Sequence, residues 1–160
     1  MTFKNSWNSP KLSVLVCLAA SLPCFAQNDV LTTALPPKLS VKRGASVAIP
    51  LAVRVKQDYH VNTNAPNEEY LIPLRLTWDP KPLTVEAVNF PPGKNEKFDF
   101  SQKPVNVYTG DFTIETKFQV PDDARVGLAF ASGKLRYQAC NLTMCLPPKT
   151  IPIQVPLEIH

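Results

Sequence analysis

Apolar and polar residues alternate along several short segments of the chain, and this alternation is the main indicator of its secondary structure. Residues 46–55 read SVAIPLAVRV, with an apolar side chain at every second position from Val47 to Val55. A period of two predicts a β-strand with one face on a core, because successive side chains of a strand point to opposite faces. Further strands or strand pairs are predicted at residues 71–78, 83–90, 111–120 and 126–139.

The last alternating segment covers residues 150–159, where every second residue from Ile151 to Ile159 is apolar. Pro152 and Pro156 fall on the other face of this segment. Proline has no backbone N–H to donate to a neighbouring strand, so these two residues predict that the segment is an edge strand.

The whole pattern favours one all-β domain. No sustained helical period follows residue 26, and seven or eight short strands separated by turn residues predict an immunoglobulin-like β-sandwich. Two predicted loops are longer than the rest, at residues 57–70 and 91–104. Long loops on a compact sandwich often carry function, so both are candidates for part of a site.

The N-terminus has the features of a secretory signal peptide at residues 1–26. Lys4 and Lys11 precede the apolar residues 12–22, and small residues at Cys24 and Ala26 indicate cleavage near Ala26. The apolar run is shorter than the roughly 20 residues that a membrane-spanning helix needs. We therefore expect export, a domain at residues 27–160, and no membrane span in the mature chain. A lipid-modified Cys24 is less favoured, because residues 21–23 do not fit the small-residue consensus.

Charge gives no reason to expect nucleic-acid binding. Removal of the signal peptide leaves 15 Lys and Arg against 13 Asp and Glu, a formal charge of +2. No basic stripe accompanies this weak balance, whereas nucleic-acid binding requires one.

The mature chain keeps two cysteines, Cys140 and Cys145, in the segment YQACNLTMCLPP. An oxidising compartment allows such a close pair to form a disulfide. A disulfide across so short a loop stabilises little, because chain entropy assigns about 3 kcal/mol even to a 15-residue loop. A turn at the end of a sandwich instead presents sulfur to a partner, as thiol–disulfide exchange requires.

Two other interpretations of the pair stay open. Short hairpin disulfides in exported domains are more often structural than catalytic. Cys140, Met144 and Cys145 are also soft ligands of the kind copper(I) prefers, and His60 or His160 could complete the shell, although neither lies at ligand spacing. His60 could tune a thiol as an imidazolium, but a solvated loop histidine is the more common case.

The segment from Tyr137 to Pro148 resembles a known family. Tyr137 and Gln138, a small residue, Cys140, a short spacer, Cys145, an apolar residue and two prolines are similar to the cysteine-containing stretch of the N-terminal periplasmic domain of DsbD. Related single-domain proteins are described as disulfide bond correctors. Weaker agreement extends through YHVNTN, LIPLRLTW and PPG, and so over most of the mature chain.

This resemblance implies a periplasmic, immunoglobulin-like thiol:disulfide oxidoreductase domain. Such a domain accepts electrons from a thioredoxin-like donor and passes them to exported disulfide isomerases or to cytochrome-maturation thioredoxins. Its redox-active disulfide is its only redox group, so no cofactor or metal is expected. The alternative is a non-catalytic exported sandwich, an interaction module whose disulfide pins a hairpin.

The resemblance also implies residue roles. Cys145 would form the mixed disulfide with partners, and Cys140 would resolve it. Phe98 or Phe100, in the loop at residues 91–104, would cap the site, and Tyr137 would either order the site or simply pack. The spacer has four residues where some family members have five. Full-length members continue into a membrane electron channel, so we expect another protein to supply the reductant here.

Overall fold

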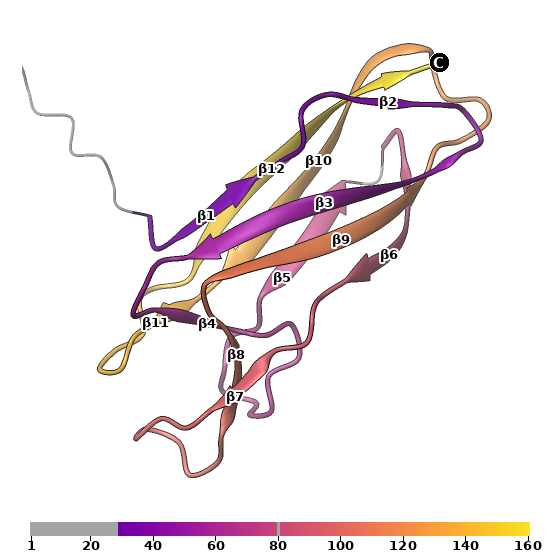
Figure 1. Ribbon diagram of the computed structural model, residues 1–160. Helices are drawn as coiled ribbons and strands as arrows, with labels where there is room; N and C mark the ends of the chain where they lie inside the picture. Colours follow the sequence, from indigo (N-terminus) through magenta and orange to yellow (C-terminus); the bar gives the residue numbers. More distant parts are fainter. Residues whose placement is uncertain (1–28, 80) are drawn as a thin grey trace, which may run out of the picture.

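The computed structural model describes residues 29–79 and 81–160, which form strands and connecting loops with no helix among them (Figure 1). A long apolar helix of the kind that crosses a membrane is accordingly not found in this part of the chain. The predicted signal peptide and its cleavage site near Ala26 lie outside the described residues.

Two four-stranded sheets form the body of the molecule. The first sheet has the order β1-β3-β9-β6, from Leu31–Ala34, Ser46–Val55, Asp111–Gln119 and Thr84–Asn89. The second sheet has the order β2-β12-β10-β5, from Leu39–Val41, Lys149–Ile159, Gly127–Tyr137 and Arg75–Asp79. All neighbouring strands are antiparallel except β2 and β12, which are parallel.

The core lies between these sheets. Ile49 and Leu51 of β3 and Val155 and Leu157 of β12 are buried and belong to one apolar cluster that draws on both sheets. Burying each such side chain stabilises the fold by about 1.5–3 kcal/mol. Two sheets packed face to face over an apolar core confirm the predicted immunoglobulin-like β-sandwich.

Most predicted strands are confirmed, with two corrections. The strand predicted at residues 71–78 begins only at Arg75, because Pro73 cannot donate to a ladder and Leu71 closes a turn by donating its N–H to the Glu68 carbonyl. The edge prediction for β12 is wrong at its C-terminal end, since β2 pairs with Leu157–Ile159. Pro152 and Pro156 precede this short paired segment, so neither proline interrupts the β2 pairing.

A small third sheet lies at one end of the sandwich, in the lower part of Figure 1. Its order is β11-β4-β8-β7, from Ala139–Cys140, His60–Asn62, Val105–Tyr108 and Lys94–Glu96. The two long loops expected at residues 57–70 and 91–104 thus contribute strands β4 and β7. The third sheet brings both loops to the strand that carries Cys140.

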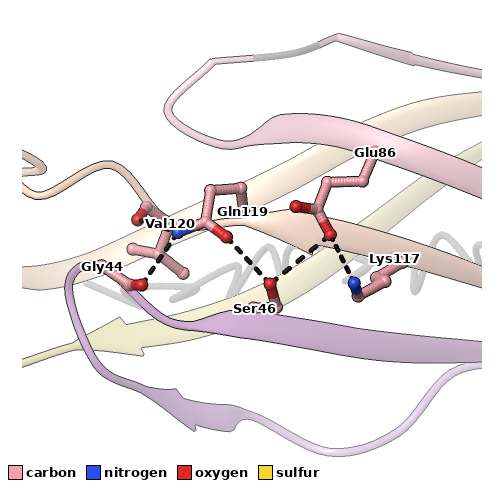
Figure 2. Close-up of polar contacts among 6 residues, drawn as sticks. All are labelled: Gly44, Ser46, Glu86, Lys117, Gln119 and Val120. Atoms are coloured by element: carbon pink, nitrogen blue, oxygen red, sulfur yellow. Dashed lines mark hydrogen bonds and ion pairs between the residues drawn. The ribbon is translucent and has the colours of Figure 1, made fainter.

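The opposite end of the first sheet is closed by polar side chains (Figure 2). Ser46 Oγ on β3 donates to Gln119 Oε1 on β9 at 2.8 Å, and Gln119 Nε2 donates to the Gly44 carbonyl at 2.9 Å. Lys117 on β9 forms an ion pair with Glu86 on β6 at 3.0 Å. These contacts tie three neighbouring strands together away from the cysteines, each exposed pair contributing less than about 1 kcal/mol.

Candidate redox site

Cys140 and Cys145 form a disulfide across a tight turn. Their Cα atoms lie 4.0 Å apart, and the two residues form an isolated antiparallel bridge. Cys140 ends β11 and is 2% exposed, whereas Cys145 belongs to the exposed residues of the turn. The two ends of the disulfide therefore differ sharply in accessibility.

Hydrogen bonds also hold the turn between the cysteines. Asn141 Oδ1 accepts from the Thr143 N–H at 2.9 Å, the Thr143 hydroxyl at 3.0 Å and the Met144 N–H at 2.9 Å. The Asn141 N–H donates to the Met144 carbonyl at 2.9 Å, and the Leu146 N–H donates to the Ala139 carbonyl at 2.8 Å. None of these five hydrogen bonds involves a sulfur atom, so all of them can form in either redox state.

His60 lies directly across the third sheet from Cys140, because the two residues are register partners on β4 and β11. Its side chain is 4% exposed, and its Nε2 atom is buried with no hydrogen-bond partner among the described residues. Burial lowers the pKa of His60 and so favours the neutral imidazole. The interpretation of His60 as a solvated loop histidine is wrong, because the predicted loop forms a buried strand here.

Phe98 covers one face of the His60 ring. The two rings are stacked with centroids 4.2 Å apart, and Phe100 stacks on Phe98 at 5.1 Å. Phe98 is 6% exposed and Phe100 is 49% exposed. Phe98 also belongs to a small buried cluster with Leu71, Val105 and Val107. The loop at residues 91–104 is thus held against β4 mainly by Phe98, with Phe100 as the outer ring.

An open cavity of about 550 Å³ lies beside this stack. His60, Phe98 and Leu142 are among its lining residues, so the cavity joins the aromatic stack to the cysteine turn. Leu142 and Met144 are 81% and 59% exposed and supply apolar surface on the turn itself. The charged residues that line the cavity are Arg54, Lys56, Asp58, Glu96 and Asp111.

Tyr137 ends β10, is buried, and belongs to the sandwich core. Burial raises the pKa of its hydroxyl. Its packing in the core is clear, while its ordering of the site stays a prediction.

The residues considered for copper(I) do not all come together. His160 follows β12 at the far end from the turn, where its Nε2 lies 2.9 Å from Ser40 Oγ. Within residues 29–79 and 81–160, no three His, Cys, Asp or Glu side chains cluster as metal ligands would. Of the two histidines considered, the structure brings only His60 to the cysteine end.

Sequence reasoning missed one residue of this site and the position of another. It did not anticipate that Asn141 organises the turn, although an asparagine directly after Cys140 was an available signal, since its side chain often bonds the backbone two residues on. It also did not anticipate the placement of His60 opposite Cys140. That placement depends on the pairing of strands that lie about 80 residues apart, which no local pattern reports.

Comparisons with known proteins identify a family and a fold. A family model described as "Thiol:disulfide interchange protein DsbD, N-terminal" matches residues 27–156. The crystal structure of the N-terminal periplasmic domain of ScsB from Proteus mirabilis matches with a TM-score of 0.51 and 12% identity. That match covers 78% of this chain and 44% of the ScsB domain, so the chain spans less than half of the structure it matches.

A second solved structure, from aggregative adherence fimbriae of enteroaggregative Escherichia coli, matches with a TM-score of 0.36 and 10% identity. This match covers 82% of this chain and all of the fimbrial chain. No curated protein sequence matches the chain. The ScsB similarity supports the fold, and the family match extends over nearly all of the described residues.

Proposed function

The chain belongs to the family of thiol:disulfide interchange protein DsbD N-terminal domains, and we propose from this premise that it relays electrons in the periplasm. Its donor is a thioredoxin-like protein, and its acceptors are exported disulfide isomerases or cytochrome-maturation thioredoxins. The Cys140–Cys145 pair carries the two electrons.

The observation that carries this proposal is the difference in exposure between the two cysteines. Exchange depends on which sulfur an approaching thiolate can reach. Cys145 is exposed and Cys140 is 2% exposed, so an incoming partner meets Cys145. Exchange through a mixed disulfide uses two such cysteines, one that bonds to the partner and one that then resolves that bond.

In the reduced domain, the Cys145 thiolate attacks a disulfide of the acceptor. A mixed disulfide forms, and the acceptor's other sulfur leaves as a thiolate. Cys140 then attacks the Cys145 sulfur, which restores the Cys140–Cys145 bond and releases the second acceptor sulfur. The domain has then lost two electrons and the acceptor has gained them, and the reverse sequence with a reduced donor reloads the pair.

The hydrogen bonds of the turn support this role over that of a structural staple. Asn141 accepts three hydrogen bonds within the turn, and two backbone hydrogen bonds flank it. The turn therefore has an internal framework apart from the disulfide. A bond that adds little to the turn's own order is free to open and close.

We assign the cap to Phe98. Phe98 stacks on His60, the cross-strand partner of Cys140, whereas Phe100 contacts Phe98 from outside. Displacement of the loop would uncover the buried side of the site. Leu142 and Met144, which precede Cys145 on the exposed turn, offer the apolar surface on which a partner would dock.

Trapping of partners tests the proposal. Cys140→Ser leaves Cys145 free to attack but removes the resolving thiol, so mixed disulfides with thioredoxin-fold proteins should accumulate in a periplasmic extract. Cys145→Ser is the matched control and should trap none. Mass spectrometry of the disulfide-linked species identifies the partners. If Cys140→Ser captures no thioredoxin-fold protein while it remains folded, the relay function is wrong.

A further inference from the structure

The third sheet places a buried base beside the resolving cysteine. Cys140 and His60 are register partners in an antiparallel pair. Side chains directly opposite each other in such a pair lie on the same face of the sheet, with Cβ atoms about 4.5–5.5 Å apart. The imidazole and the Cys140 sulfur therefore project from the same face of the third sheet.

Both side chains are shielded from bulk water. Cys140 is 2% exposed and His60 is 4% exposed, and Phe98 stacks on the imidazole ring. A group that ionises on either side chain needs a partner inside the protein, because both side chains have little direct exposure to solvent.

His60 has an unpartnered ring nitrogen, which is an acceptor when the neutral ring carries its proton on Nδ1. Its Nε2 atom is buried without a hydrogen-bond partner among the described residues, and buried polar atoms of this kind are rare enough to require an explanation. In the oxidised protein the Cys140 sulfur carries no proton. Reduction gives Cys140 an S–H donor on the strand directly opposite His60.

We infer that His60 Nε2 accepts the proton of the Cys140 thiol when Cys140 resolves the mixed disulfide. This inference rests on the proposed exchange function. The Cys140 S–H bond breaks and its proton passes to Nε2, while the Cys140 sulfur bonds to Cys145. The bond from Cys145 to the partner sulfur breaks, and the departing thiolate takes the proton from the imidazolium. The ring ends neutral, and two electrons have passed to the partner.

The surroundings of His60 are compatible with a neutral acceptor. Burial lowers its pKa, and no charged neighbour is among the causes of that shift. The titratable and charged residues that line the cavity adjacent to His60 are Arg54, Lys56, Asp58, Tyr59, Glu96 and Asp111. Arg54 and Asp111 form an ion pair with each other at 2.7 Å.

Stopped-flow exchange with dithiobis(nitrobenzoate) separates the two chemical steps. The reduced, exported protein releases a first nitrothiobenzoate when Cys145 attacks and a second when Cys140 resolves. His60→Phe keeps a ring for stacking on Phe98 but has no acceptor. We expect this variant to slow the second release at least about tenfold, as for loss of a general base, and to leave the first unchanged.

A second variant and a pH profile separate proton transfer from packing. His60→Gln can accept a hydrogen bond but cannot take up the proton, so its second release should also be slow. In the unsubstituted protein, the rate of the second release should fall as the pH drops through the pKa of His60. The two variants should lack that inflection. A second release at the unsubstituted rate in a folded His60→Phe protein overturns the inference.

An NMR measurement needs no variant at position 60. The chain has two histidines, and His160→Gln assigns the ring nitrogen resonances of the other. Reduction of the disulfide should change the chemical shift of the His60 Nε2 resonance, and an unchanged resonance overturns the inference. If the unsubstituted protein releases no nitrothiobenzoate at all, the exchange function itself fails. Normal release with an unchanged His60 refutes only the role of His60.

Discussion

The sandwich body and the third sheet differ in whether their buried polar side-chain atoms have hydrogen-bond partners. In the body, the buried Thr116 hydroxyl accepts a hydrogen bond from Trp78 Nε1 at 3.0 Å, and the surrounding core is apolar. In the described residues, the three buried side-chain atoms without a partner are His60 Nε2, Asn62 Oδ1 and Thr63 Oγ1, all on or next to β4.

This difference indicates that one region provides the stability of the domain and the other its reactivity. Leaving a buried polar atom unpaired costs about 1–3 kcal/mol. The unpaired atoms of the third sheet lie close to the disulfide, and the burial of apolar side chains in the body offsets their cost. We conclude that the body sets the free energy of unfolding, while the third sheet is arranged for a reaction. Four experiments test this division, from the largest expected effect to the smallest.

Phe118→Ala should cause the largest loss of stability. Phe118 is fully buried in the body and packs edge-on against Trp78. Its truncation should lower the free energy of unfolding by about 3–5 kcal/mol, because it leaves a cavity in a packed core. Urea unfolding measures the loss. Phe100→Ala at the half-exposed ring of the third-sheet end is the control, and equal losses would contradict the division.

Reduction of the disulfide should cost much less than the loss of Phe118. The cysteines are five residues apart, so chain entropy predicts a loss of less than about 3 kcal/mol. The reduced domain should therefore stay folded, with unchanged circular dichroism. Redox titration with dithiothreitol should give a potential above about −300 mV, within reach of thioredoxin-like partners. Unfolding on reduction would make the bond a structural staple.

Acidification should weaken the fold through His60. Burial lowers the pKa of His60 in the folded state below its ordinary value of 6.5, so the unfolded chain binds its proton more tightly. The contribution of neutral His60 to the free energy of unfolding is fully present above pH 6.5. It falls as the pH drops toward the folded pKa, by at most about 1.4 kcal/mol per pH unit. His60→Phe should remove this part of the pH dependence, measured by urea unfolding. His160→Gln should leave it intact, and loss of the slope in that control would assign it elsewhere.

Phe98→Ala should have the smallest of the four free-energy effects on the redox site itself, measured as the rate at which the disulfide is reduced. Loss of its stacking on His60 removes about 1 kcal/mol of contact from the cap, which would speed reduction of the disulfide by dithiothreitol about fivefold. Thiol trapping over time measures this rate. Phe100→Ala should speed reduction less, because Phe100 lies outside Phe98. A larger effect of Phe100→Ala would transfer the cap to that residue.

The body of the fold could be predicted from the sequence because its strands are long and alternate. Strand β3 matches the prediction over all of residues 46–55, and β12 begins one residue before the predicted start. Each of these strands has a buried face with period two, and that period is visible without knowledge of the partner strand.

The third sheet could not be predicted in the same way. Strands β4, β7, β8 and β11 have two to four residues each, too few to establish a period. They form because distant segments pair and bury one another. The cysteines and the phenylalanines could be selected as candidate site residues from the family resemblance, but the surroundings of His60 depend on four short strands, two of which, β4 and β7, lie in segments predicted as loops.

The hydrogen-bonded turn at Asn141 has a consequence for the speed of the proposed relay. A carrier whose structure rearranged at every cycle would spend time on that rearrangement. Here five hydrogen bonds that involve no sulfur hold the turn in place, so opening the disulfide requires little movement of the backbone. Once the loop at residues 91–104 is displaced, turnover would then be set by how often a partner meets Cys145 in a suitable orientation, and therefore by the concentrations of donor and acceptor around it.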